Sequence, residues 1–153
     1  MNHNIEDERA RQIEILSGAY VSKKLYEKYC SEADKKYGLT ICEGEVLMHL
    51  RLRGGESAAK DIVEKNWISK SQVSKSVEHL TSMGYITASA DENDRRIVRL
   101  RLTEAAEAPV RELEKATDRY MDKMSENLSN EEIRELNRLL QKMTDNIRKG
   151  SKQ

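Results

Sequence analysis

Apolar residues recur at helical spacing near both ends of the chain. From about Ile5 to Cys30 they stand mostly three to five positions apart, which predicts one long helix with an apolar stripe. Between Ser129 and Ile147 they alternate three and four positions apart, as in a coiled-coil seam, and Ser129 with Glu132 forms the pattern of a capping box. The stripes consist of Ile13, Leu16, Tyr20, Leu25 and Tyr29, and of Ile133, Leu136, Leu140, Met143 and Ile147. Because such stripes need to be buried, we expect the last helix to pair with the first.

Shorter helical patterns occupy the first part of the middle region. A helix is predicted between Thr40, which forms a capping box with Glu43, and the glycine pair that begins at Gly54. A second, short helix is predicted over 57–65. The residues expected to face inward are Val46, Leu47 and Leu50 with Ile41 in the first of these helices, and Ala58, Ile62 and Val63 in the second.

The helix predicted over 69–83 has the most complete local signals. Ser69 and Gln72 form an S-x-x-Q capping box, and Gly84 stands where a left-handed residue would end the helix. Val73, Val77 and Leu80 form its inward stripe. At about 100° per residue, the outward positions are then Ser71, Ser74, Lys75, Glu78 and Ser82, with Gln72 at the flank.

Two β-type runs follow, at 85–89 and 97–102, on either side of the polar loop that starts at Asp91. They predict a β-hairpin with one buried face and one wet face.

A fifth helix is predicted from Thr103 onward, where Pro109 is expected to remove one backbone hydrogen bond. The resulting fold class is mainly α with a small β-hairpin wing. Two short helices, a tight turn and a hairpin with a charged tip are the order of a winged helix-turn-helix, whose second helix enters the major groove of DNA.

Composition and charge limit the classes of function and the compartment that can be expected for this chain. The 153 residues are about one domain, and the 27 basic residues equal the 27 acidic ones, so a DNA contact has to come from a local patch. No apolar run approaches the roughly 20 residues that span a bilayer, and the charged start lacks the apolar stretch of a secretory signal. We therefore expect a cytoplasmic protein without membrane contact. Cys30 and Cys42 are expected to be reduced thiols.

One basic patch coincides with the predicted major-groove helix. Between Glu64 and Glu78 the chain has three lysines and no acid. Serine hydroxyls, an amide and a lysine can bond base edges, and Gln in particular can bond adenine through two hydrogen bonds. We therefore assign Ser71, Gln72, Ser74 and Lys75 to DNA contact and Lys70 to a phosphate. An ordinary solvated helix face is the alternative interpretation of this pattern.

The hairpin tip supports the DNA interpretation. Arg95 and Arg96 lie between the two strand-like runs, where an arginine can enter a minor groove and Asp94 can hold its guanidinium extended. The alternative is a surface salt bridge in a turn. We predict that Asp94, Arg95 and Arg96 belong to the DNA interface.

Three segments are similar to those of a known family: LTICEGEVLMHL, ISKSQVSKSVEHLTSMGYI and DENDRRIVRLRLT. With them, and over nearly its whole length, the chain resembles the MarR family, the multiple antibiotic resistance regulators. The resemblance implies one MarR-like domain over 1–153, with dimerisation helices at about 1–38 and 104–149 and the winged helix-turn-helix at about 39–103. It implies a homodimer on a palindromic operator, with Arg96 in the minor groove and Asp94 as its orienting partner. Asn66 and Trp67 depart from the usual turn, and we expect Trp67 to pack against it.

The resemblance also implies a repressor released by a small, often aromatic, effector, with no cofactor. Tyr20, Tyr26, Tyr29 and Tyr37 are candidates for an effector cleft, although tyrosines at this spacing are more often core or interface. Redox sensing through Cys30 or Cys42 is an alternative. A zinc site is not expected, because His3, His49 and His79 supply no pair on one helical face.

Two other classes of function remain. An enzyme is not expected, since the sequence has no phosphate-binding glycine loop, H-E-x-x-H motif or nucleophile elbow. A winged-helix module that binds protein instead of DNA is the second rival, because fold alone does not establish function. The acid-free basic helix and the paired arginines of the wing favour DNA.

Overall fold

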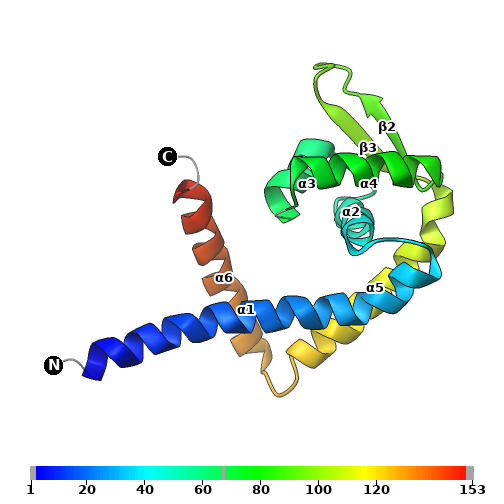
Figure 1. Ribbon diagram of the computed structural model, residues 1–153. Helices are drawn as coiled ribbons and strands as arrows, with labels where there is room; N and C mark the ends of the chain where they lie inside the picture. Colours follow the sequence, from blue (N-terminus) through cyan, green and yellow to red (C-terminus); the bar gives the residue numbers. More distant parts are fainter. Residues whose placement is uncertain (1–2, 67, 151–153) are drawn as a thin grey trace. The chain divides into compact units, whose positions relative to one another are not determined.

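A computed structural model describes the backbone of residues 3–66 and 68–150, and the side chains of residues 11, 14–15, 17–65 and 68–150. Its elements are α1 (His3–Lys36), α2 (Ile41–Leu52), β1 (Glu56–Ala58), α3 (Ala59–Asn66), α4 (Lys70–Ser82), β2 (Ile86–Ala90), β3 (Val98–Leu102), the 3₁₀ turn η1 (Glu104–Ala106), α5 (Glu107–Met124) and α6 (Asn130–Gly150) (Figure 1). The predicted mainly helical fold with a small wing is confirmed. The chain divides into two compact units, residues 1–120 and 121–153.

The sheet has three antiparallel strands in the order β1-β3-β2, one more than the predicted hairpin. The helix predicted from Ser57 is wrong at its start, because Ser57 and Ala58 lie in β1 and pair with Leu100 and Arg99 of β3. Ser57 is buried, and its Oγ lies 3.2 Å from His49 Nε2. Pairing with a distant strand therefore overrides the local preference of this segment for helix.

The hairpin is buried only at its base. Ile86 of β2 and Leu100 of β3 are in the core, whereas residues 87–90 are all exposed. The predicted buried face of the hairpin is therefore confined to its base. Residues 87–90 of β2 are thus open to solvent, whereas Ile97 and Arg99 on the other side of the hairpin are partly buried.

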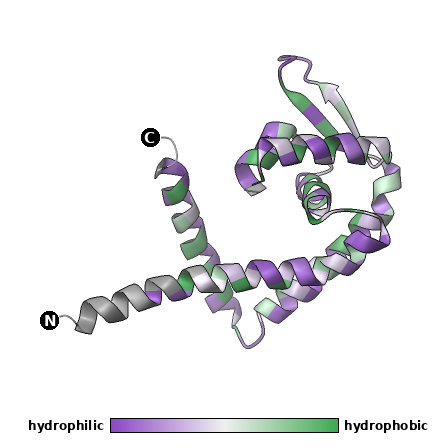
Figure 2. Ribbon diagram, in the orientation of Figure 1, coloured by the Kyte–Doolittle hydropathy of each residue, from purple (hydrophilic) through white to green (hydrophobic). Residues whose placement is uncertain are grey.

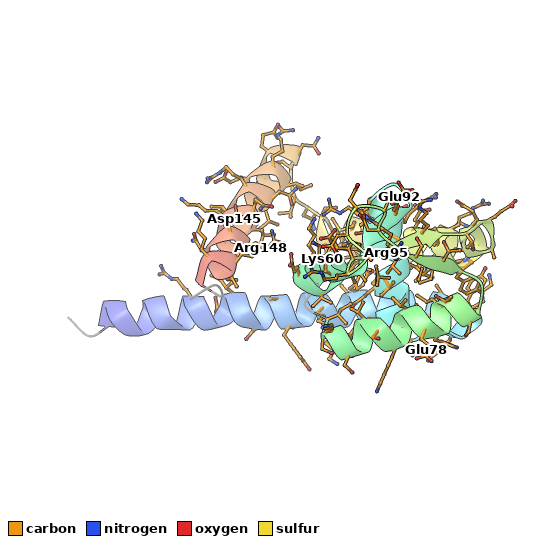
Figure 3. All side chains as sticks on the ribbon, turned by 90° about the horizontal axis from the view of Figure 1, so that it is seen from above. Lys60, Glu78, Glu92, Arg95, Asp145 and Arg148 are labelled. Carbon is orange, nitrogen blue, oxygen red and sulfur yellow. The ribbon has the colours of Figure 1, made fainter. Side chains whose placement is uncertain are left out.

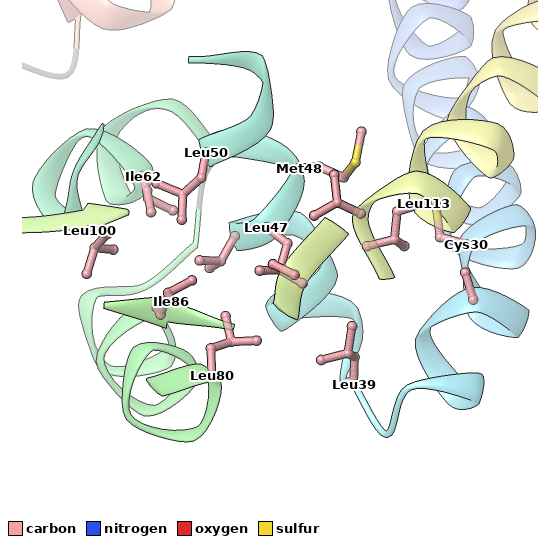
Figure 4. Packing of buried hydrophobic residues seen from close by; sticks show 14 of the residues in the cluster. Cys30, Leu39, Leu47, Met48, Leu50, Ile62, Leu80, Ile86, Leu100 and Leu113 are labelled. Carbon is pink, nitrogen blue, oxygen red and sulfur yellow. The ribbon is translucent and has the colours of Figure 1, made fainter. Parts of the chain in front are cut away.

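The core of the first unit lies where α2 meets α1, α3, α4 and the sheet (Figure 4). The buried apolar residues include Leu47 and Leu50 of α2, Ile62 of α3, Leu80 of α4, Ile86, Leu100 and Leu113. Each such side chain stabilises the fold by about 1.5 to 3 kcal/mol through burial. The inward residues predicted for α2, α3 and α4 are confirmed except that Val63 and Val77 are partly buried and Ile41 is 39% exposed.

Helix α1 is longer than predicted and continues to Lys36. Its second half packs against α5 through Tyr120, whose hydroxyl lies 2.5 Å from Ser22 Oγ and whose ring meets Tyr26 edge to face. Tyr20, predicted to be buried, is 64% exposed because it lies before this contact. The side chains of Ile13 and Leu16 lie outside the described residues.

Pro109 does not remove a hydrogen bond from α5, contrary to the prediction. It is the third residue of the helix, and the first four N–H groups of an α-helix have no partner within it. Pro109 is also buried, so its ring adds to the core.

Helix α6 in the second unit begins with the predicted capping box, in which Ser129 N donates to Glu132 Oε2 at 2.8 Å and Glu132 N donates to Ser129 Oγ at 3.2 Å. Hydrophobic and hydrophilic residues alternate along α6 (Figure 2), and four residues of its apolar stripe are exposed within a single chain, namely Leu136, Leu140, Met143 and Ile147. Leu136, Leu140 and Met143 are 44%, 48% and 43% exposed. The pairing of the first and last helices stays a prediction. None of the described helices combines the length and apolar content needed to cross a membrane.

Candidate nucleic-acid interface

The start of α4 is fixed by the predicted capping box. Gln72 N donates to Ser69 Oγ at 3.2 Å, and Gln72 Oε1 accepts from Ser69 N at 3.2 Å and from Ser69 Oγ at 2.8 Å. The helix ends as predicted, with Gly84 at φ 76° and Tyr85 N donating to Leu80 O at 3.0 Å. The first and last turns of α4 are therefore held by its own sequence.

Contacts with α2 fix which face of α4 points outward. Val73 and Leu80 are buried, and so is Ser76, whose Oγ donates to Cys42 Sγ at 3.2 Å. His79 Nδ1 lies 2.8 Å from Glu43 Oε1, while the other oxygen of Glu43 accepts Thr40 N in the capping box of α2. The burial of Ser76 and this bond between helices were not predicted, because neither follows from spacing along one helix.

The residues of α4 that were assigned to DNA contact are Lys70, Ser71, Gln72, Ser74 and Lys75, and all of them are exposed. Neither lysine has an ion-pair partner within the described residues. Gln72 differs from the expectation, because both acceptor positions of Oε1 are occupied by Ser69. Two hydrogen bonds to adenine would require Gln72 to release the cap.

The wing places Asp94, Arg95 and Arg96 at its exposed tip. Asp94 Oδ1 accepts the backbone N–H of Arg96 at 3.0 Å and lies 3.7 Å from Arg96 Nε. The expected pair is therefore present, although Asp94 makes its hydrogen bond to the backbone and not to the guanidinium. The Arg96 side chain is 94% exposed and can be reoriented at little cost.

Asp91 shapes the wing and was not predicted. Its Oδ1 accepts Asn93 N at 2.9 Å and Asp94 N at 3.2 Å, and its Oδ2 accepts Arg99 Nε at 2.7 Å. The hydrogen bond from Arg99, followed by those from the loop backbone, holds the pKa of Asp91 below its usual value. An aspartate at the start of a loop commonly accepts from the backbone two residues later, and that signal could have identified it.

A groove of about 440 Å³ lies between α3, the first half of α4 and the wing. Val63, Val73 and Val77 supply apolar surface to it, and Lys60, Lys70 and Arg96 lie among its lining residues together with Glu64, Ser74, Ile97 and Val98. Lys60 of α3 and Arg95 of the wing are labelled in Figure 3. Three elements that are separate in sequence thus line one surface.

The cysteines differ in environment. Cys30 is 2% exposed, and burial raises the pKa of its thiol. Cys42 is partly buried and accepts the hydrogen bond from Ser76. A buried thiol with a raised pKa is poorly suited to redox sensing, because the thiolate is the reactive form.

The histidines described here are occupied by structural contacts, His49 with Ser57 and His79 with Glu43. The side chain of His3 lies outside the described residues, as does Trp67. Over the part of the chain that the structure describes, no three His, Cys, Asp or Glu side chains gather as metal ligands would.

The four tyrosines proposed for an effector cleft do not lie together. Tyr26 and Tyr29 both meet Tyr120, with ring centroids 5.4 and 6.4 Å away. Tyr37 is partly buried against the core, and Tyr20 is exposed. Burial raises the pKa of Tyr26, so its hydroxyl stays neutral.

The central region of the chain matches a known family of domains. Residues 39–106 match the family model described as "Winged helix DNA-binding domain". The uncharacterized HTH-type transcriptional regulator YdgJ of Bacillus subtilis (strain 168) is 30% identical over 101 residues, which are 66% of this chain and 62% of YdgJ. The match thus covers less than two thirds of that relative's length.

Solved structures share the fold. A MarR transcriptional regulator from Methanosarcina mazei Go1 has a TM-score of 0.73 and 22% identity, covering 89% of this chain and 98% of its own. NadR in complex with 4-hydroxyphenylacetate has a TM-score of 0.74 and 20% identity, covering 85% and 92%. A mutant MarR from E. coli complexed with operator DNA has a TM-score of 0.63 and 20% identity, covering 88% and 91%. The predicted winged helix domain and the predicted resemblance to the MarR family in fold are confirmed.

Proposed function

We propose that this chain, which carries a winged helix DNA-binding domain within the fold of MarR-family regulators, is a sequence-specific regulator of transcription that binds double-stranded DNA. One observation carries the proposal: α4 presents an exposed polar face without acids in its first half, beside a wing tipped by two arginines. Since the whole chain has no net charge, this concentration of positive charge is local.

The residues have separate roles in the proposal. Ser71, Ser74 and Lys75 reach base edges in the major groove. A side chain that makes two hydrogen bonds to one base contributes about 1 to 3 kcal/mol of discrimination against the other bases. Lys70 and Arg95 bind phosphates, and Arg96 enters the minor groove. The side-chain oxygen of Gln72 keeps the start of α4 in place. Gln72 therefore contacts DNA only through its side-chain nitrogen, which the cap does not use.

The proposed active form is a homodimer on a palindromic operator. Support comes from the apolar residues that each unit leaves exposed: Ile15, Tyr20 and Val21 on α1, and the stripe of α6. Such a surface is typical of an interface between subunits. Two-fold symmetry of the protein would be matched by two half-sites in the DNA.

We further propose that a small aromatic effector releases the protein from DNA and that the bound state represses a nearby gene. The support is the similarity in fold to NadR, whose structure holds 4-hydroxyphenylacetate. The effector would act by changing the spacing of the two α4 helices.

A DNA titration tests the proposal. Fragments upstream of the gene, or duplexes selected from random sequences, are titrated with the wild type in about 0.15 M salt, and sedimentation gives the oligomeric state. Arg96→Ala and Lys75→Ala should each weaken binding about tenfold, whereas Arg119→Ala, an exposed arginine of α5, serves as the matched control. Binding that neither interface variant weakens, or the absence of any selected sequence, would contradict the proposal and favour the protein-binding module.

A further inference from the structure

We infer that the junction between α1 and α2 is a pH-sensitive switch in which Asp34 is the titrating group. Protonated Asp34 allows the two helices to pack as they do in the structure. Ionised Asp34 draws water into the junction and separates them, which changes the position of α4 and weakens DNA binding. The inference rests on the proposed DNA-binding function and adds regulation by protons to it.

The carboxyl group of Asp34 lies in a dry space between the two helices. Asp34 is 3% exposed, and neither of its oxygens has a hydrogen-bond partner among the described residues. Its Oδ1 occupies the space that a side chain at Gly44 of α2 would fill. Cys30 and Leu39, which precede and follow Asp34 in sequence, are buried in the core (Figure 4). A neutral carboxyl group is tolerated in such a place, whereas a carboxylate requires water or a cation.

The titratable groups around Asp34 oppose its ionisation. Glu45 and Glu43 of α2 both repel a negative charge on Asp34, and on α1 such a charge raises the pKa of the Cys30 thiol. Within the described residues no ion pair joins Asp34 to a cation. Burial first, then Glu45 and Glu43, raises the pKa of Asp34 from 3.8 to about 7 in the packed arrangement.

The direction of the switch follows from this difference in pKa. Once water reaches the carboxyl group, its pKa returns toward the ordinary 3.8. Between pH 3.8 and about 7 the separated arrangement has lost the proton that the packed arrangement keeps. Rising pH therefore favours separation by about tenfold per unit in this window and has little further effect above it. Between pH 5 and pH 8 the ratio of separated to packed chains grows about 100-fold.

Glu43 connects the junction to the DNA-binding helix. It precedes Gly44 in α2, and its Oε1 lies 2.8 Å from Nδ1 of His79 on α4. A second bond joins the same two helices, since Ser76 Oγ of α4 donates to Cys42 Sγ of α2 at 3.2 Å. When α1 and α2 separate, α4 therefore moves with α2 relative to α1. Because α1 belongs to the proposed dimer interface, this movement changes the spacing of the two α4 helices in the dimer.

DNA affinity measured from pH 5 to pH 8 tests the switch. The duplex selected by the wild type is titrated with wild type, Asp34→Asn and Glu32→Gln at constant salt. Glu32 is an exposed acid on the same helix and serves as the control. Wild type and Glu32→Gln should lose about tenfold more affinity than Asp34→Asn over this range, most of it below pH 7. Other groups titrate in all three proteins, so their effect cancels in the comparison.

Gly44→Ala tests the geometry without a titration. Its Cβ meets Asp34 Oδ1 and should separate the helices at every pH. At pH 5 this variant should therefore bind DNA as weakly as the wild type does at pH 8, with little pH dependence. Backbone amide exchange at pH 8 reports the opening without DNA, and residues 39–46 should exchange faster in the wild type than in Asp34→Asn.

Cooperative melting establishes that the variants fold. If they do not, carboxyl-carbon NMR of the wild type decides, because a titration midpoint of Asp34 at its ordinary 3.8 would overturn the inference. An equal loss of affinity in wild type and Asp34→Asn, unaltered pH dependence in Gly44→Ala, or equal exchange over residues 39–46 would also overturn it while DNA binding itself persisted. Failure of the wild type to bind any duplex at any of these pH values would instead overturn the proposed function.

Discussion

Asp34 of α1 is a buried carboxyl group whose ionisation should limit the stability of the fold. It is 3% exposed, and neither of its oxygens has a hydrogen-bond partner among the described residues. Its Oδ1 faces the Cα of Gly44 on α2, in space that a Cβ there would fill. Burial first, and then repulsion from Glu45 and Glu43, raises the pKa of Asp34 from its ordinary 3.8 to about 7.

The magnitude follows from this difference in pKa. A gap of about 3 pH units, at 1.36 kcal/mol per unit, makes burial of the ionised Asp34 cost about 4 kcal/mol. Between pH 3.8 and about 7 the unfolded chain has lost this proton and the folded chain keeps it. The free energy of unfolding therefore falls as pH rises through this window and levels off above it.

Asp34→Asn removes the titration while keeping the shape. The free energy of unfolding is measured with urea at pH 5 and pH 8, at one protein concentration. The difference between variant and wild type should shift in favour of the variant by about 2 to 3 kcal/mol from pH 5 to pH 8. Glu32→Gln, an exposed acid on the same helix, is the control and should show no such gain. The amide has its own unmet hydrogen bonds, which add a cost that does not depend on pH. Parallel pH profiles for wild type and Asp34→Asn would refute the reasoning.

Three further predictions concern α4, the wing and the thiols. Ser69→Ala should destabilise the fold by about 1 kcal/mol in thermal or urea unfolding, while Ser71→Ala, two residues after the cap, should not; equal effects would contradict the capping role. Asp91→Asn should speed backbone amide exchange over residues 92–97 with little change in the melting of the core, because it loses the charged contact with Arg99; unchanged exchange would argue against that role. Cys30 should react with a thiol reagent only after unfolding, and rapid labelling of the folded protein would restore the redox alternative.

Local signals in the sequence determined where three helices begin, because each of them starts with a capping box formed by two residues three positions apart. The boxes formed by Thr40, Ser69 and Ser129 each predicted a helix start that the structure confirms. The wing, its arginine tip and the exposed face of α4 were also predicted, because turn chemistry and helical periodicity depend on neighbouring residues. The DNA contacts of these residues stay predictions.

The tertiary structure alone decided features that depend on residues far apart in sequence. Ser57 lies in a strand because Leu100 pairs with it, and Lys60 joins α4 and the wing in one groove because α3 packs beside them. Asp34 looks like any surface acid of a charged helix until α2 covers it. Spacing along a helix specifies which residues share a face, but burial and pairing depend on what the rest of the chain brings against that face.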